Sequence, residues 1–294
     1  MSSPAGAGPL GILAGGGEVP LRVARTARAA GRPVLVVALE GWADPAHFAG
    51  LPLIVARLGA AGAIMDRLRA EGITELVLTG RASRPSLLAL RPDAGGVRLL
   101  ARIGRAAFAG DDGLLRATAA ALEAEGFRVV PVQQVLRDIM PEAGLLAGSA
   151  PDAVARADIA RGIAVLRAMG DVDVGQAVVV QQGLVLGVEA IEGTDALLAR
   201  CAGLRREGPG GVLVKLSKPG QDRRVDLPTI GPVTIQGAAS TGLRGIVVEA
   251  GGSILVNRPA TLADAETAGL FLLAIRPECF NPEEISRWAN SSTP

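Results

Sequence analysis

The stretch that decides the fold is Leu10-Gly-Ile-Leu-Ala-Gly-Gly-Gly-Glu18, followed by a mixed segment to Ala30 and by Pro33-Val-Leu-Val-Val-Ala-Leu39. A short apolar run ends in three glycines, and the segment after them predicts a helix with Pro20 in its first turn, where proline is tolerated. The unbroken apolar run that follows is typical of a parallel strand covered on both faces. The order strand, glycine loop, helix, strand predicts a βαβ unit.

The same alternation continues along the first half of the chain. The residue patterns predict further helices over 61–70 and 114–125, and further strands over 75–79 and 127–131. Repeated strand–helix alternation is the signature of an open parallel sheet. We therefore expect an α/β fold with a Rossmann-like N-terminal domain over residues 1–132.

The second half has a different character. Prolines and glycines interrupt residues 133–154, which we interpret as a linker. Short strands and helices then predict a second, mixed α/β domain over 155–280 that carries the catalytic residues, followed by a polar tail over 281–294. Helices are expected at 151–169, 196–201 and 233–241, and strands at 178–180, 184–189, 211–215, 245–249 and 253–256.

Composition excludes several classes of protein. The 294 residues include 30 basic and 29 acidic side chains with no dense basic block, which argues against a nucleic-acid binder. The two cysteines, Cys201 and Cys279, are expected to be reduced thiols rather than a disulfide or zinc site. No signal peptide and no apolar run near the roughly 20 residues of a membrane span are found. We expect a cytoplasmic protein, with contact to the inner membrane limited to its surface.

Three glycines, Gly15, Gly16 and Gly17, form the first candidate site. Glycines at a helix start let the backbone approach a phosphate. The spacing does not match the G-x-G-x-x-G fingerprint, and no P-loop lysine follows, so NAD binding is the weakest interpretation. A tight strand–helix turn and a nucleotide or phosphate contact both remain open.

The second candidate site is Gly110-Asp-Asp-Gly113, just before a predicted helix. One of the two acids, Asp111 or Asp112, is explained as an ordinary helix N-cap. Two adjacent acids between glycines also suit a metal ion or a ribose hydroxyl. The residues alone do not decide between these interpretations.

The densest polar cluster runs from Lys215 to Pro228, with a second acidic stretch at 189–195 upstream. Its cations suit a diphosphate, because arginine grips two phosphate oxygens and lysine offers a compact charge. Its carboxylates suit a hard divalent cation. Cations for phosphate and acids for Mg²⁺ are what phosphoryl transfer needs, although a charge run of this kind also occurs as a surface ion-pair network. His47, the only histidine, supports no Ser–His–Asp arrangement.

Taken together, these segments closely resemble the Mg²⁺-dependent UDP-2,3-diacylglucosamine pyrophosphatases of lipid A biosynthesis, which are distinct from the metallophosphoesterases that perform the same step. The resemblance covers about residues 9–275. It is carried by the segments 11–17, 110–112, Asp173-Val-Gly-Gln176, Val188-Glu-Ala-Ile-Glu-Gly-Thr-Asp195 and 215–231, the last containing Arg224-Val-Asp-Leu-Pro-Thr-Ile-Gly231.

The resemblance implies hydrolysis to UMP and 2,3-diacylglucosamine 1-phosphate, with water attacking the β-phosphorus. It also implies a Rossmann-like first domain, a homodimer, a sugar site between the domains and an essential aspartate that maps to Asp226. With the residue patterns, it gives the expected catalytic residues Asp226, Asp222, Lys215, Lys218 and Arg224. The expected Mg²⁺ ligands are Asp226, Asp222, Glu192 and Asp195. The expected substrate-binding residues are Gly15, Gly16, Gly17, Asp111, Asp112, Gln176, Glu189, Thr194 and Gln221.

Two rival functions fit parts of the sequence. The first βαβ unit also suits an NAD-dependent oxidoreductase, and a UDP-sugar or lipid sensor without catalysis is a rival from another class. Neither rival needs a group of carboxylates for a metal, so the acids and lysines between Glu189 and Asp226 argue against both.

Overall fold

The computed structural model describes residues 8–82, 90–104 and 111–283. The chain forms two compact units, and the first comprises Met1–Arg137 together with Asp222–Asp226. The second comprises Asp138–Gln221 together with Leu227–Pro294. The sequence placed all of 155–280 in the second domain, so the membership of residues 222–226 in the first unit is a difference that only the structure reveals.

The first unit is built on a five-stranded parallel sheet with the strand order β3-β2-β1-β4-β5. In chain order its elements are β1 (Leu10–Ala14), α1 (Val19–Ala29), β2 (Val34–Leu39), β3 (Leu53–Ala56), α2 (Ala61–Ala70), β4 (Glu75–Thr79), α4 (Ala94–Ile103), α5 (Asp111–Ala124) and β5 (Arg128–Val129). The predicted strand–glycine–helix–strand unit is confirmed as β1, α1 and β2.

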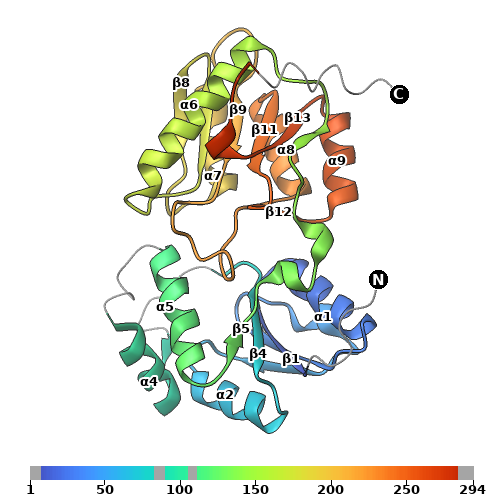
Figure 1. The fold of residues 1–294 in the computed structure, drawn as a ribbon, viewed down its shortest axis with the longest axis vertical. Coiled ribbons are helices and arrows are strands. Elements are labelled where there is room, and N and C mark those ends of the chain that lie inside the picture. Colours follow the sequence, from blue (N-terminus) through green and yellow to red (C-terminus); the bar gives the residue numbers. More distant parts are fainter. Residues whose placement is uncertain (1–7, 83–89, 105–110, 284–294) are drawn as a thin grey trace. The chain divides into compact units, whose positions relative to one another are not determined.

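Helices cover both faces of this sheet (Figure 1). Leu35, Val37 and Leu39 on one face of β2 pack in a core cluster with α2 and α5. The alternate residues of β2 face the other way, toward the apolar side of α1, because side chains alternate along a strand. Burial on both faces is the physical reason that β2 reads as an unbroken apolar run.

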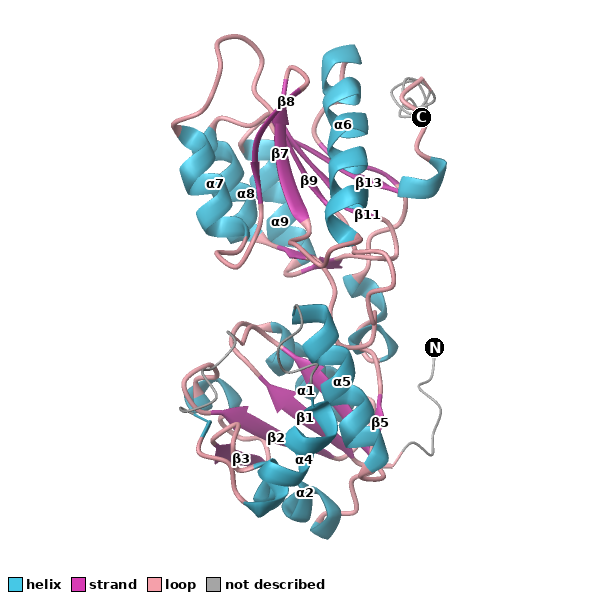
Figure 2. Cartoon of the chain, turned by 90° about the vertical axis from the view of Figure 1, so that its left-hand side faces the viewer, coloured by secondary structure: helices cyan, strands magenta, loops and turns pink. Residues whose placement is uncertain are grey.

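The second unit contains a six-stranded mixed sheet with the order β6-β13-β11-β9-β7-β8 and a small parallel pair, β10 with β12. In chain order its elements are β6 (Gly144–Ala147), α6 (Ala153–Gly170), β7 (Ala177–Gln181), β8 (Leu184–Val188), α7 (Thr194–Ala202), β9 (Val212–Lys215), β10 (Thr229–Ile230), α8 (Pro232–Thr241), β11 (Gly245–Glu249), β12 (Ile254–Leu255), α9 (Arg258–Thr267) and β13 (Phe271–Ile275). Figure 2 shows α6 on one side of this sheet and α7, α8 and α9 on the other.

Two core clusters follow from this three-layer arrangement. One contains Ile159 and Ile163 of α6 with one set of strand residues, such as Val214. The other contains residues of α7, α8 and α9, such as Leu197, with the alternate strand residues, such as Leu213. Both faces of the central strands are therefore buried, which leaves the strand ends as the places where polar chemistry can be built.

The predicted fold class, a Rossmann-like domain followed by a mixed α/β domain, is confirmed. Several elements were not predicted: β3, α4, β10, α9, β13 and β6, the last of which lies inside the segment interpreted as a linker. β3 is an edge strand of only four residues, and β6 is a short edge strand next to prolines and glycines. In the described part of the chain, none of the helices combines the length and the apolar character needed to cross a membrane.

Candidate active site

One edge of the second unit's sheet gathers polar side chains from four strand ends. Lys215 is the last residue of β9, and β11 runs parallel beside it and ends at Glu249. β7 runs antiparallel on the other side of β9, and Gln176 immediately precedes its first residue. β8 is antiparallel to β7, so its end and the following Glu189 lie at this same edge. The carboxyl ends of parallel strands are the usual place for ligands in open α/β sheets.

A buried ammonium group and a buried carboxylate are linked there through a hydroxyl. Lys215 is 6% exposed, Thr194 9% and Glu189 5%. Lys215 Nζ donates a hydrogen bond to Thr194 Oγ1 at 2.6 Å, and Thr194 Oγ1 donates to Glu189 Oε1 at 2.5 Å. Charges are rarely buried unless they are paired or functional, so this trio marks a built site and not a solvated face.

Gln176 is the next residue in this network. Its backbone N–H donates to Glu189 Oε2 at 3.0 Å. Gly175 allows this approach: its φ is 48°, and a Cβ atom there would lie 1.9 Å from the carbonyl oxygen of Glu189. Positive φ and contact with backbone are conditions that only glycine meets without strain. Glycine at position 175 therefore allows the loop before β7 to pack closely against the residue that follows β8.

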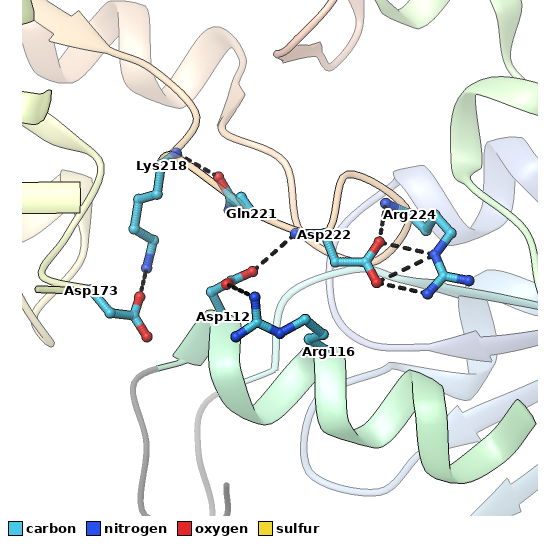
Figure 3. A network of polar contacts seen from close by, with 7 residues as sticks. All are labelled: Asp112, Arg116, Asp173, Lys218, Gln221, Asp222 and Arg224. Carbon is cyan, nitrogen blue, oxygen red and sulfur yellow. Dashed lines mark hydrogen bonds and ion pairs between the residues drawn. The ribbon is translucent and has the colours of Figure 1, made fainter. Parts of the chain in front are cut away.

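The second lysine, Lys218, contacts Asp173 and Gln221 (Figure 3). Lys218 Nζ lies 2.5 Å from Asp173 Oδ1. The backbone N–H of Lys218 donates to Gln221 Oε1 at 2.8 Å, and Gln221 Nε2 reaches Gln176 Oε1 at 3.4 Å. The contacts thus form one network within the second unit, whose members are Lys215, Thr194, Glu189, Gln176, Gln221, Lys218 and Asp173.

Six of the residues predicted for catalysis or substrate binding are members of this network, and the structure confirms that they lie together, while their roles stay predictions. Asp173, Glu249 and Ser217 were not among the predicted site residues. Glu249, which is 6% exposed, accepts a hydrogen bond from the backbone N–H of Ser217 at 3.0 Å. The Ser217 hydroxyl donates to the carbonyl of Gly252 at 2.9 Å. The position of an acid directly at the end of the buried strand β11 was the signal that could have found Glu249.

The other predicted catalytic residues lie in the first unit. The backbone N–H of Asp222 donates to Asp112 Oδ1 at 3.1 Å, and Asp112 is a buried residue of α5 (Figure 3). The guanidinium of Arg224 contacts both carboxylate oxygens of Asp222, through Nε at 3.0 Å to Oδ1 and through Nη2 at 2.8 Å to Oδ2. Arg224 Nη1 also lies 2.6 Å from Glu123 Oε1. Asp226, which is half-buried, ends this segment.

These contacts set the charge states of the pair. The hydrogen bonds from the Arg224 side chain lower the pKa of Asp222 below its ordinary value. Asp222, with Glu123, raises the pKa of Arg224 above its ordinary value. Both groups are thus charged at neutral pH, and each neutralises the other. Both carboxylate oxygens of Asp222 thus contact Arg224, and the role of Asp222 as a metal ligand stays a prediction.

The four expected metal ligands do not form a ligand cluster of their own. Glu192 accepts two hydrogen bonds from Arg200, at 3.2 and 2.9 Å, and one from a backbone N–H. Asp195 is exposed in the first turn of α7. Within residues 8–82, 90–104 and 111–283, no three His, Cys, Asp or Glu side chains are grouped so that they could hold a metal ion. Mg²⁺ at a phosphate site commonly takes only one or two carboxylates and completes its shell with phosphate oxygens and water. The binding of Mg²⁺ by these residues therefore stays a prediction.

In the glycine loop, two of the three glycines are fixed by close packing of backbone. The N–H groups of Gly15 and Gly16 donate to the carbonyls of Thr79 and Arg81, at 2.9 and 2.8 Å. A Cβ at Gly15 would lie 2.5 Å from the Arg81 carbonyl oxygen, and one at Gly16 would lie 2.7 Å from that of Trp42. These two positions support the tight-turn interpretation. Phosphate contact by the loop stays a prediction that rests on Gly17 and the start of α1.

We expect Gly16→Ala to lower the free energy of unfolding by about 2 kcal/mol or more, because the added Cβ collides with a carbonyl that has no side-chain freedom to move. Urea unfolding of the variant and of Gly8→Ala measures this effect. A Cβ at Gly8 meets nothing within 4 Å, so the control should unfold like the wild type. Equal stability of both variants would show that the loop is looser than its hydrogen bonds indicate.

The segment 110–113 is only partly described. Gly110 and the side chain of Asp111 lie outside the described residues, and Asp111 is the first residue of α5. Asp112 accepts the Asp222 N–H and also lies 3.6 Å from Arg116 Nη1. Asp112 thus has a role that the sequence did not indicate, because it binds the backbone of the distant segment 222–226.

Comparison with known proteins relates both halves of the chain to one family. A family model described as the LpxI N-terminal domain matches residues 9–139, and the model of the LpxI C-terminal domain matches residues 142–273. The curated UDP-2,3-diacylglucosamine pyrophosphatase LpxI of Caulobacter vibrioides is 43% identical over 277 residues, which cover 92% of this chain and 98% of that protein. A solved GalE-like L-threonine dehydrogenase from Cupriavidus necator covers 95% of this chain and 88% of its own at 13% identity, with a TM-score of 0.28 that is too low to bear on the fold.

Proposed function

Because the chain belongs to the LpxI family of UDP-2,3-diacylglucosamine pyrophosphatases, we propose that it hydrolyses UDP-2,3-diacylglucosamine in lipid A biosynthesis. The products are UMP and 2,3-diacylglucosamine 1-phosphate. The family assignment confirms the resemblance to the UDP-2,3-diacylglucosamine pyrophosphatases and supports a hydrolase of a phosphoric anhydride, while the dependence on Mg²⁺ and the distinction from metallophosphoesterases stay predictions. The dehydrogenase and the non-catalytic sensor have no comparable support.

One observation carries the site assignment: both lysines at the sheet edge belong to a single network of buried and half-buried polar groups. A diphosphate brings negative charge that must be offset where it is bound. Ammonium groups held in a partly dry environment interact with phosphate oxygens more strongly than they would in water. We assign Lys215 and Lys218 to the diphosphate of the substrate, with Gln176 and Gln221 positioning their loop.

The proposed reaction breaks the bond between the β-phosphorus and the bridging oxygen. Water supplies the new oxygen on the β-phosphorus, and UMP leaves with the bridging oxygen and its electron pair. Lys215 and Lys218 offset the charge that gathers on the oxygens during this step. Asp226 is the side chain that we place at the reacting phosphate, either to accept a proton from water or to hold a metal ion. We assign Arg224 the role of holding the segment 222–226, which carries Asp226, in position.

Mg²⁺ is the proposed cofactor. When bound, it would neutralise diphosphate charge and polarise the phosphorus–oxygen bond. Asp226 and oxygens of the substrate are the groups of this site that would hold it, since Mg²⁺ favours carboxylate, phosphate and water ligands. A homodimer and a location in the cytoplasm, in transient contact with the inner membrane surface, complete the proposal. The lipidic substrate is the reason for the membrane contact.

The test is incubation of the purified protein with UDP-2,3-diacylglucosamine in ¹⁸O-enriched water, with Mg²⁺ or with EDTA. We expect UMP to form with Mg²⁺ and not with EDTA, and mass spectrometry to find the label in the acylated sugar phosphate. Label in UMP would move the attack to the α-phosphorus. Undiminished turnover in EDTA would remove the metal from the proposal, and no UMP under any condition would remove the activity.

A further inference from the structure

Residues 222–226 lie in the C-terminal half of the sequence but belong to the first structural unit. The residues on both sides of them belong to the second unit, whereas these five belong to the first. They contain no regular secondary structure, and their internal backbone hydrogen bonds form a turn in which the N–H groups of Val225 and Asp226 both donate to the Asp222 carbonyl. A turn this short cannot hold a fixed position by itself. Its position must come from the groups around it.

Helix α5 supplies two of those groups. Near the start of α5, Asp112 accepts the backbone N–H of Asp222 at 3.1 Å. Close to the end of the same helix, Glu123 Oε1 lies 2.6 Å from Arg224 Nη1. The two attachments are separated by most of the length of α5, so they fix both the position and the orientation of the turn.

Charge and packing strengthen the second attachment. Arg224 lies between Asp222, which is in its own turn, and Glu123, which is on the helix, so its guanidinium joins the turn to α5. Val225 packs against the core cluster that includes Ala119 and Leu122 of α5. Arginine with two carboxylates forms directional, charge-assisted hydrogen bonds, which suit a positioning role.

We infer that Glu123 is a positioning residue for Asp226: by holding Arg224, it fixes the turn that carries Asp226 at the reacting phosphate. This inference rests on the proposed function, which gives Asp226 its place in the reaction. Glu123 touches neither substrate nor metal in this account, and it acts through Arg224 alone.

Two measurements on Glu123→Gln and Glu123→Ala test the inference. Hydrogen–deuterium exchange, followed by mass spectrometry of a peptide covering 221–227, should show faster exchange in both variants. Exchange in β1, β2 and β4 should stay as in the wild type. Steady-state kinetics should show kcat lowered about tenfold or more in Glu123→Ala, with KM changed less than twofold, because the misplaced group serves the reaction step rather than substrate binding. Glu123→Gln, which keeps an acceptor for Arg224, should lie between Glu123→Ala and the wild type.

Glu71→Ala is the matched control, because Glu71 forms an exposed pair with Arg67 on α2 at 2.8 Å. It should leave both exchange and kcat unchanged. The double variant Glu123→Ala with Arg224→Met should be no slower than Arg224→Met alone, because the two residues act as a unit. Unchanged exchange in residues 221–227, additive losses of kcat, or faster exchange with normal kcat would each overturn the inference. Absence of turnover in the wild type would instead refute the proposed function, and the exchange data would still decide whether Glu123 anchors the turn.

Discussion

Asp226→Asn will lower kcat by about a thousandfold or more and leave the folded structure intact. Loss of one group that stabilises developing charge or activates the nucleophile in a phosphoryl transfer is typically worth roughly 10²–10³ in rate, and a residue with both roles is worth more. Asparagine has the same shape as aspartate, so the turn 222–226 should keep its contacts with α5. UMP release gives the rate, and urea unfolding with exchange of residues 221–227 checks the structure.

Asp66→Asn provides the comparison for this prediction. Asp66 lies on α2 with a side chain that is 81% exposed, and it pairs with Arg69 only at 3.5 Å. The same change of charge there should leave kcat within about twofold of the wild type, because surface pairs contribute little. If Asp226→Asn retains near-normal turnover, the turn carries another reactive group, and the role of Asp226 is wrong.

Lys215→Met should lower kcat/KM by about 10²–10³-fold, which corresponds to roughly 3–4 kcal/mol of transition-state stabilisation. Methionine fills similar space without the ammonium. Thr194 Oγ1 and the Gln176 N–H can still donate to Glu189 after this change, so we expect the variant to fold. Enzyme kinetics and a thermal unfolding scan measure the two effects.

Lys215→Arg keeps a positive charge at this position, but we expect its kcat/KM to stay well below that of the wild type. Lys215 is 6% exposed, so a guanidinium must be forced into a filled space, and such overpacking is destabilising. Arginine also presents a planar fork instead of a compact charge. Full rescue by arginine would show that net positive charge is sufficient and that the buried contact with Thr194 is incidental.

The composition of the chain supports a specific role for Lys215 and Lys218. Lys215 and Lys218 are the only lysines in the sequence, and all its other strongly basic side chains are arginines. Lysine and arginine differ in shape, hydration and hydrogen-bonding geometry. A chain that uses arginine everywhere else and lysine only at this sheet edge is what a requirement for compact ammonium groups would produce.

The fold was predictable where the signals were local. The run 10–14, the glycine loop and the run 34–39 specify β1, α1 and β2 through patterns only a few residues long. The polar network in the second unit was partly predictable in the same way, because Lys215 ends a buried strand and Glu189 directly follows strand β8. Parallel strands and their antiparallel neighbours then bring those ends to one edge.

The membership of residues 222–226 in the first unit was not predictable from such local signals. Lys215 to Asp226 reads as one continuous cluster, yet the structure divides it between two units after Gln221. Asp112 and Glu123 contact this segment within the first unit, and they are 110 and 101 residues away from their partners in the sequence. In the sequence, nothing distinguishes Glu123 from an ordinary surface acid of a helix. Asp112 reads equally well as a cap, a metal ligand or a ribose ligand until its partner, the Asp222 N–H, is known.

The central claim is that both lysines meet the diphosphate, and nuclear magnetic resonance of the protein labelled with ¹³C at lysine Cε tests it most directly. The two lysines give two signals, which Lys215→Arg and Lys218→Arg assign. In Asp226→Asn, which should bind substrate without consuming it, both signals should shift on addition of UDP-2,3-diacylglucosamine, and neither should shift with uridine alone. If the substrate saturates the protein and both lysine signals stay where they are, the diphosphate is bound elsewhere and the site described here is wrong.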